Sequence, residues 1–204
     1  MNEKNNRLLI SLNKSALLND RGLLFSFIAI LFGLIFGTVL TVFFENGIKN
    51  EILSLFVSFN TEIADKSKME LFSGIILSGL LYFGAMFISG GNIFGKELSL
   101  IITAVKASGI TAVIAFLYSQ YALKGLEYCL LIFLPGKLIF MFGMLFMTKC
   151  CFDFSKKLRC NSNEVIKDTK LFSLKSSISF LIFMLSWTVD FLAIIVFSGL
   201  FDFK

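Results

Sequence analysis

The charged residues inside long apolar runs are the groups in this sequence that could do chemistry. Asp190 lies near the middle of the run 176–201. Lys106 and Lys137 interrupt two earlier runs. A charge at the centre of a bilayer costs about 2.5 to 3.5 kcal/mol, so it needs a partner or water. We expect Asp190 to face the interior of a helix bundle and to pair with Lys106 or Lys137. The alternative is a protonated Asp190 that hydrogen-bonds a nearby Ser or Thr.

Lys137 directly follows Pro135 and Gly136, a pair that predicts a kink or a split in a helix. Proline removes a helix hydrogen bond, and the glycine after it loosens the backbone. Non-helical backbone at membrane depth is tolerated where it is buried in protein or lines water. The break therefore indicates an internal cavity or a notch for a partner, or else a simple kink filled by neighbouring helices. Lys106 has a second interpretation too, because its long side chain could reach back to the membrane surface.

The composition argues against most enzyme chemistry. The 204 residues include no His, which removes histidine-based triads, mixed Cys/His zinc sites and the commonest general base. The four cysteines form no CxxC pair, and we interpret them as reduced structural thiols. The sequence has no phosphate-binding loop and no pair of catalytic carboxylates. We expect no catalytic residue, no metal site and no cofactor.

The elements that position these residues are membrane-spanning helices. Hydrophobic residues make up 56% of the chain, charged residues 16%, and the mean hydropathy is +0.83. A spanning helix needs about 20 apolar residues. The sequence predicts an all-α, polytopic membrane helix bundle with about five transmembrane helices in one domain, the fourth broken at Pro135. A basic arm at 1–22 precedes the predicted spans, which are 23–44, 71–89, 98–118, 126–148 and 176–201.

The segment Glu45–Glu70 is mixed in polarity, and its apolar residues fall mostly on one side of a helix. We interpret it as an amphipathic helix lying on the membrane, with Phe56 and Phe59 as candidate partner contacts. A loop packed on the outer ends of the spans is an equal alternative. In the first span Gly33 and Gly37 form GxxxG, a spacing that lets another helix approach closely.

The basic residues predict the orientation of the chain rather than a nucleic-acid partner. The net charge is +5, but 26 Phe and one Pro do not fit a nucleic-acid-binding domain. Twelve Lys and Arg residues fall on one side of the predicted spans and five on the other. Seven of the twelve lie in the segment 149–175, a basic loop expected to contact anionic lipid. The excess places the N-terminus in the cytoplasm and the C-terminus outside.

The stretch from Lys106 to Pro135 reads KASGITAVIAFLYSQYALKGLEYCLLIFLP and resembles the stage II sporulation protein M family of bacterial membrane proteins. The family has a similar length, five predicted spans, an opening FGxxxG and an acidic residue in the last span. Ala107, Ala115 and Ala122 stand where its members often have Gly. The matching positions are Lys106, Gly109, Phe116, Tyr121, Lys124, Gly125, Leu134 and Pro135. Gly109 and Gly125 join Gly33 and Gly37 as predicted helix-packing residues.

The resemblance implies a non-enzymatic scaffold in the bacterial cell membrane. In spore formers the namesake works with a membrane-anchored peptidoglycan hydrolase and a second such enzyme during engulfment. Related proteins occur beside transporter ATPases in clusters that make circular bacteriocins, so the alternative is a subunit of a peptide export or immunity system. The expected partners are membrane lipids and either the wall hydrolase or the ATPase. The oligomeric state stays open, a homo-oligomer included.

Overall fold

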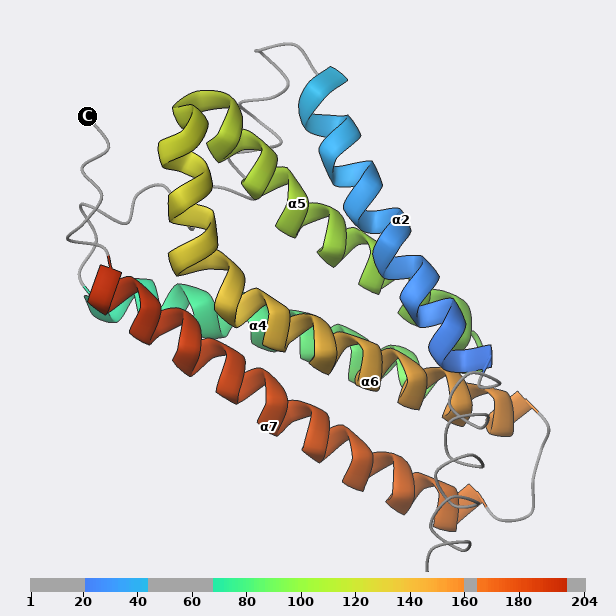
Figure 1. The fold of residues 1–204 in the computed structure, drawn as a ribbon. Coiled ribbons are helices and arrows are strands. Elements are labelled where there is room, and N and C mark those ends of the chain that lie inside the picture. Colours follow the sequence, from blue (N-terminus) through green and yellow to red (C-terminus); the bar gives the residue numbers. More distant parts are fainter. Residues whose placement is uncertain (1–20, 44–67, 160–164, 198–204) are drawn as a thin grey trace, which may run out of the picture.

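The computed structural model describes residues 21–43, 68–159 and 165–197, and every element in these ranges is a helix (Figure 1). Five helical stretches are long and apolar enough to cross a membrane, which confirms the predicted all-α, multi-pass bundle. They are Arg21–Phe43, Phe72–Gly90, Gly95–Ser119, Tyr121–Arg159 and Asp168–Phe197. The elements are α2 (Arg21–Phe43), α4 (Lys68–Gly90), α5 (Gly95–Tyr128), a π-helical turn η2 (Cys129–Phe133), α6 (Leu134–Arg159) and α7 (Val165–Phe197).

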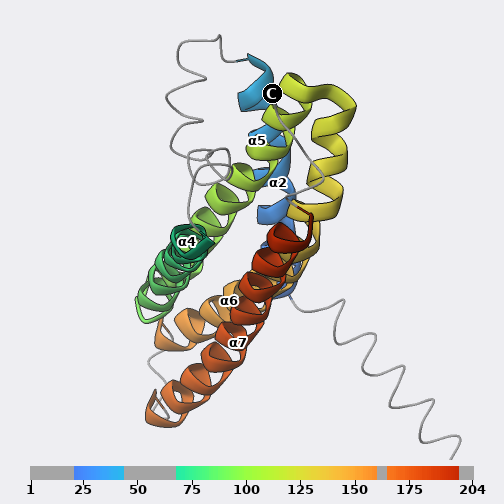
Figure 2. The same cartoon turned by 90° about the vertical axis from the view of Figure 1, so that its left-hand side faces the viewer.

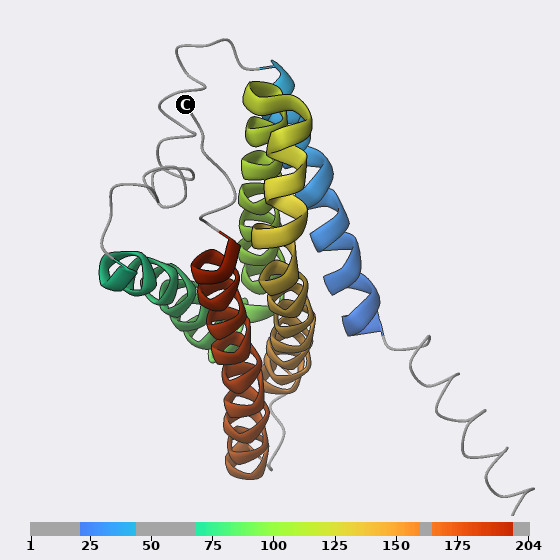
Figure 3. The same cartoon turned by 60° about the vertical axis from the view of Figure 1, so that its left-hand side comes forward.

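Two helix pairs and one further helix make the bundle. α2 runs beside α5, and α6 runs beside α7 (Figure 1). α4 packs against α5, α6 and α7. Figure 3 shows α2 and α4 at opposite edges of the bundle, and Figure 2 shows α6 and α7 side by side. The space between α4, α5, α6 and α7 is therefore an interior region built by four helices.

The turn between the third and fourth spans lies inside α5. Ala122 has φ 48° and ψ −122°, a non-helical conformation that glycine adopts more easily than alanine. α5 therefore consists of a long part and a short part that runs back beside it (Figure 1). The chain then continues through η2 into α6.

The break predicted at Pro135 appears as a π-helical turn just before that residue. Pro135 is the second residue of α6, and η2 ends two positions earlier at Phe133. A proline has no N–H to donate, and its ring clashes with the carbonyl four residues earlier, which is Leu131 in η2. A π turn widens the helix at that point. In Figure 1 the chain changes direction between η2 and α6.

The basic segment expected as a loop is mostly helical. Its residues up to Arg159 belong to α6, and those from Val165 belong to α7. These helices extend beyond the apolar runs. The basic residues are tolerated there because Lys and Arg side chains at a helix end can reach the membrane surface. Residues 1–20 of the predicted basic arm and 45–67 of the predicted amphipathic segment, Phe56 and Phe59 included, lie outside the described residues, whereas 21–22 belong to α2 and 68–70 to α4.

Candidate functional site

The centre of the candidate site is an ion pair between α6 and α7. Lys137 Nζ donates a hydrogen bond of 2.6 Å to Asp190 Oδ2. The side chain of Asp190 is 6% exposed and that of Lys137 is 24% exposed. Lys137 also lies over the ring of Phe133, with Nζ 5.2 Å from the centroid. Of the two lysines considered as partners from the sequence, the structure places Lys137 in contact with Asp190.

Gly136 makes this contact sterically feasible. A Cβ atom at position 136 would lie 1.8 Å from Asp190 Oδ1, far inside any allowed contact. The carbonyl of Gly136 accepts a hydrogen bond of 2.8 Å from Ser186 Oγ, one turn before Asp190 on α7. The Pro135–Gly136–Lys137 sequence is thus an anchor where α7 contacts α6 through backbone, hydroxyl and carboxylate groups together.

The ion pair lies at one end of a seven-residue repeat along α7. The buried residues recur at alternating spacings of four and three, the pattern of a coiled-coil seam. Its members are Phe172, Ser176, Ser179, Phe183, Ser186, Asp190 and Ala193. Ser179 Oγ donates to the carbonyl of Gly143 at 3.2 Å, and a Cβ at Gly143 would lie 2.7 Å from the Phe183 ring. Short polar side chains and glycines thus hold α6 and α7 close together.

The sequence interpretation did not identify this repeat, although its signal is present in the sequence. Ser179 and Ser186 stand seven residues apart and Asp190 follows four residues later. Small polar residues at heptad spacing in an apolar span indicate a helix interface. Trp187, which is buried against Gly79 of α4, was likewise not predicted.

Lys106 points into the bundle rather than back along its helix. Its Nζ lies 5.7 Å from the centroid of the Phe140 ring on α6. Phe140 is a core residue that packs on Tyr82 and Phe183. The lysine therefore contributes its charge to the interior, where it contacts an aromatic face instead of the membrane surface.

A cavity of about 290 Å³ lies between the four inner helices. Lys106 and Lys137 both line it. Gly109, a predicted helix-packing residue, lines it as well. A smaller cavity of about 20 Å³, enough for about one water molecule, lies on the Asp190 side of Lys137. Lys137, Phe133 and Ile75 line both cavities, whereas Asp190 lines only the smaller one.

A second polar cluster joins α4, α5 and α6. The hydroxyls of Thr103 and Thr148 lie 2.7 Å apart, and Tyr82 Oη lies 3.4 Å from Thr103 Oγ1. Thr148 Oγ1 is 2.7 Å from the carbonyl oxygen of Met144. Cys151 Sγ donates to the carbonyl of Met86 at 3.2 Å. These groups connect three helices across the interior, so their hydrogen bonds serve assembly.

Three of the predicted packing glycines make close backbone contacts. A Cβ at Gly33 would lie 2.3 Å from the Ala104 carbonyl oxygen, and one at Gly37 would lie 2.2 Å from that of Ser108. The GxxxG motif of α2 therefore packs directly on α5. A Cβ at Gly125 would lie 2.2 Å from the carbonyl oxygen of Leu117. Gly125 thus packs within the turn around Ala122.

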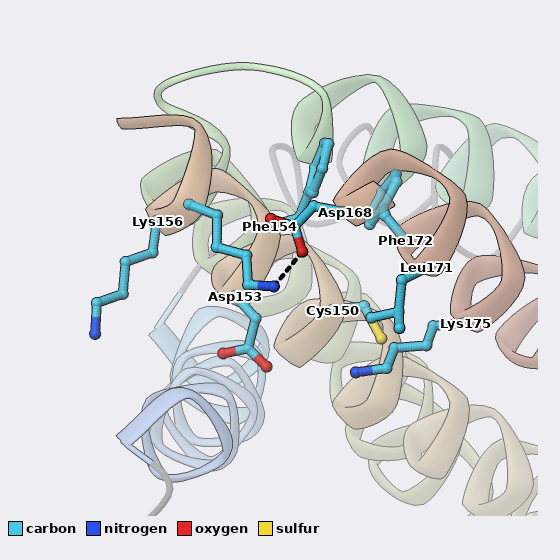
Figure 4. Close-up of a pocket in the computed structure, with 9 residues that line it drawn as sticks. Cys150, Asp153, Phe154, Lys156, Asp168, Leu171, Phe172 and Lys175 are labelled. Atoms are coloured by element: carbon cyan, nitrogen blue, oxygen red, sulfur yellow. Dashed lines mark hydrogen bonds and ion pairs between the residues drawn. The ribbon is translucent and has the colours of Figure 1, made fainter. Parts of the chain in front are cut away.

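The ends of α6 and α7 form a pocket of about 380 Å³, here called the basic pocket because its lining has three Lys residues against the two carboxylates of Asp153 and Asp168 (Figure 4). Lys157 donates a hydrogen bond to Asp168, the one ion pair drawn there. Lys156 points away from the other labelled side chains (Figure 4). Lys175, also in the lining, lies near Cys150.

The same end of the bundle is fastened to the turn between α4 and α5. Arg159 Nη2 lies 3.1 Å from Glu97 Oε2 and donates to the carbonyl of Ile93 at 3.1 Å. Ser155 Oγ donates to the same carbonyl at 2.9 Å. Lys96 Nζ lies over the ring of Phe152 at 4.9 Å. Basic side chains from α5 and α6 are therefore gathered at this end.

Among the described residues, no group of three or more His, Cys, Asp or Glu side chains could hold a metal ion. Cys129, Cys150 and Cys151 are buried free thiols. Comparisons of the chain with models of protein families, with functionally described proteins and with solved structures found no match.

Proposed function

We propose that this chain is a non-enzymatic, multi-pass scaffold of the bacterial cell membrane that holds partner proteins in or next to the bilayer. Its preferred partner class is a membrane-anchored enzyme that remodels peptidoglycan. The scaffold assembles around the anchor of α6 and α7 at Gly136, Lys137 and Asp190. No catalytic role is assigned to these residues.

The observation that carries the proposal is the use of polar side chains in the bundle interior. Lys137 contacts Asp190, Ser186 contacts the Gly136 carbonyl, and Thr103 contacts Thr148. Each of these contacts joins two different helices. A catalytic site needs a reactive group that is free to meet a substrate. Interior groups that are used to join helices support a structural role.

The charge distribution supports an orientation with the N-terminus in the cytoplasm. Arg21 begins α2 at the same end of the bundle that carries Arg159 (Figure 1). Basic residues are retained on the cytoplasmic side of membrane proteins. Large apolar side chains are exposed along α2, which supports lipid as the surrounding medium.

The sequence resemblance around Lys106 to Pro135 supports the choice of partner class. That resemblance is to a family whose namesake works with peptidoglycan hydrolases. Leu134 and Pro135, the matched Leu-Pro pair, directly precede the anchor at Gly136 and Lys137. The pair has a structural role there, because the proline follows the π turn at which the chain changes direction into α6.

The basic pocket of α6 and α7 favours a second candidate function. Lys156, Lys157 and Lys175 lie at the end expected in the cytoplasm, where a soluble ATPase could bind. In that case the chain is a membrane subunit of a peptide export or immunity system. The wall-enzyme scaffold remains the preferred proposal, because the polar side chains in the described interior join helices to one another.

Affinity purification in mild detergent, followed by identification of the co-purifying proteins, tests the two candidates. A peptidoglycan hydrolase supports the scaffold, and an ATPase without a hydrolase contradicts it. Phe56→Asp should abolish hydrolase capture, whereas the matched Phe56→Leu should retain it. The double variant Lys156→Gln/Lys157→Gln should leave hydrolase capture unchanged. Loss of ATPase capture in the double variant, and not in Phe56→Asp, would favour the export subunit.

A further inference from the structure

The 290 Å³ cavity between α4, α5, α6 and α7 carries an excess of positive charge. Both Lys106 and Lys137 line it, and the described residues of its lining include no Asp or Glu. The carboxylate of Asp190 bonds to Lys137 from the far side and lines the separate, smaller cavity. Together Lys106, Lys137 and Asp190 carry one formal positive charge.

Lys106 is the lysine that this sum leaves without an ion pair, although the Asp190 carboxylate that bonds to Lys137 also attracts it. Within the ranges that the structure describes, no carboxylate forms an ion pair with it, and its ammonium contacts the Phe140 ring. It also stands near the middle of the span Gly95–Ser119. A cation at this depth costs about 2.5 to 3.5 kcal/mol, which an anionic partner would offset.

The depth of Lys106 decides which anion can reach it. The hydrocarbon core is about 30 Å thick, so lipid phosphates lie about 15 Å from the level of a residue at mid-span. A transmembrane helix, by contrast, can carry a carboxylate at any depth, and such residues face polar partners rather than lipid. An acidic side chain of another membrane helix therefore matches both the charge and the depth.

The cavity is accessible along α4. Leu81 on its lining is 67% exposed. The neighbouring half-buried lining positions on α4 are Gly74 and Ser78, which have little or no side chain, whereas Gly79 is covered by Trp187. Small residues let a second helix approach closely. A carboxylate carried by such a helix can therefore enter past α4 and reach Lys106.

We propose that Lys106 and this cavity form the docking point for an Asp or Glu side chain on a transmembrane helix of a partner protein. The proposal rests on the scaffold function and specifies how the partner is recognised within the bilayer. The carboxylate replaces part of the contact with Phe140 by a charge-assisted hydrogen bond to Lys106 Nζ. Lys137 stays paired with Asp190, so the bound carboxylate neutralises the one positive charge that remains among the three groups.

The test uses a designed peptide, because the depth and charge of the ligand are its defining features. A polyleucine transmembrane peptide with one central Glu, and a matched peptide with Gln, are labelled and titrated into the full-length chain in neutral lipid nanodiscs. Binding is measured by energy transfer to a dye on Lys204→Cys in a chain whose four native cysteines are Ser. We expect the Glu peptide to bind about tenfold more tightly than the Gln peptide, because only the Glu peptide forms a desolvated charge pair with Lys106.

Variants of Lys106 and of the cavity mouth then locate the site. Lys106→Gln should remove the preference for Glu, and Lys106→Arg should retain it. Ser78→Leu, which narrows the mouth without changing a charge, should weaken binding of the Glu peptide. Ser177→Leu, the same change at an exposed position of α7, should not. If Lys106→Gln does not fold, Ser78→Leu still tests the site.

Four results would overturn the proposal. Two concern the peptides: equal binding of the Glu and Gln peptides, or a preference for Glu that persists in Lys106→Gln. The other two are competition by phosphatidylglycerol, which would show a lipid headgroup in the cavity, and a dimer of the chain that forms without peptide and depends on Lys106. The scaffold function is separable from this test. Failure to capture any native wall enzyme while the Glu peptide binds leaves the site standing and removes the scaffold. If Lys106→Gln captures a wall enzyme as well as the wild-type chain does, the scaffold stands and the docking site is removed.

Discussion

Gly136 and Asp190 occupy one shared space, since a Cβ atom at position 136 would lie 1.8 Å from Oδ1 of the carboxylate. The missing side chain on α6 lets α7 approach until Lys137 Nζ and Asp190 Oδ2 are 2.6 Å apart. It also leaves the Gly136 carbonyl open to Ser186, which donates a hydrogen bond of 2.8 Å. One glycine therefore permits both of the polar contacts that anchor α7.

Gly136→Ala should destabilise the bundle by about 2 kcal/mol, because the added methyl group must displace the Asp190 carboxylate. Thermal unfolding in detergent, followed by size-exclusion fluorescence, measures the change. Gly84→Ala is the matched control, since a Cβ there meets nothing within 4 Å. That variant should be neutral or slightly more stable, as alanine favours a helix. An unchanged midpoint for Gly136→Ala would contradict the packing described.

Breaking the ion pair from either side should cost more than removing both partners. Asp190→Asn and Lys137→Met each leave one buried charge unpaired, and we expect losses of about 3 kcal/mol. The double variant Lys137→Met/Asp190→Leu should lose clearly less than the sum, which a double-mutant cycle measures. An Asp190→Asn variant with the wild-type melting midpoint would instead support a protonated Asp190 that acts as a hydrogen-bond donor.

Gly37→Val should detach α2 from α5. The Cβ alone would lie 2.2 Å from the Ser108 carbonyl oxygen and from Thr111 Oγ1, and the branched side chain adds further volume. Crosslinking between cysteines introduced at Ile30 and Ala107, both buried along this pair of helices, reports the contact. We expect at least a several-fold loss of crosslinked product. Thr38→Val, an exposed position on the same helix, should leave the yield unchanged.

Ala122→Gly should stabilise the chain by about 1 kcal/mol. Alanine at φ 48° is strained, and glycine adopts this conformation at lower cost. The melting midpoint of the full chain measures the gain. Ala115→Gly, which places the same residue inside a regular helix, should lower the midpoint. Equal effects of the two substitutions would show that the turn conformation does not govern stability.

The predicted orientation can be tested by cysteine labelling in intact cells. In a chain whose native cysteines are replaced by Ser, Lys124→Cys should react with a membrane-impermeant maleimide added outside. Lys156→Cys should react only after the cells are opened, because it lies at the opposite end of the bundle. The reversed pattern would place the N-terminus outside and the basic pocket beyond the reach of a cytoplasmic ATPase.

The amino-acid sequence alone identified the apolar runs, the break near Pro135 and Asp190 as a charge inside the last span. These features were accessible because a charge, a proline or a run of apolar residues has a large energetic effect at its own position. The GxxxG motif at Gly33 and Gly37 was accessible for a similar local reason, because two glycines one turn apart create a flat strip on one helix.

The sequence could not decide which faces of the spans meet. In a bilayer both lipid and protein interior are apolar, so hydrophobic periodicity does not mark the packed side. The spacing of small polar residues on α7 is present in the sequence, but only the structure shows that Gly136 and Gly143 of α6 lie opposite it. The choice of Lys137 over Lys106 as the partner of Asp190 likewise depends on the relative rotation of two helices.

The sequence by itself therefore determined that this protein is a helical membrane protein with charges in its interior. Only the tertiary structure decided that Lys137 is neutralised by Asp190 and that Lys106 faces a cavity whose described lining residues include no Asp or Glu. The physical reason is that electrostatic pairing acts over a few ångströms. Such distances between residues far apart in the chain exist only after the helices have packed.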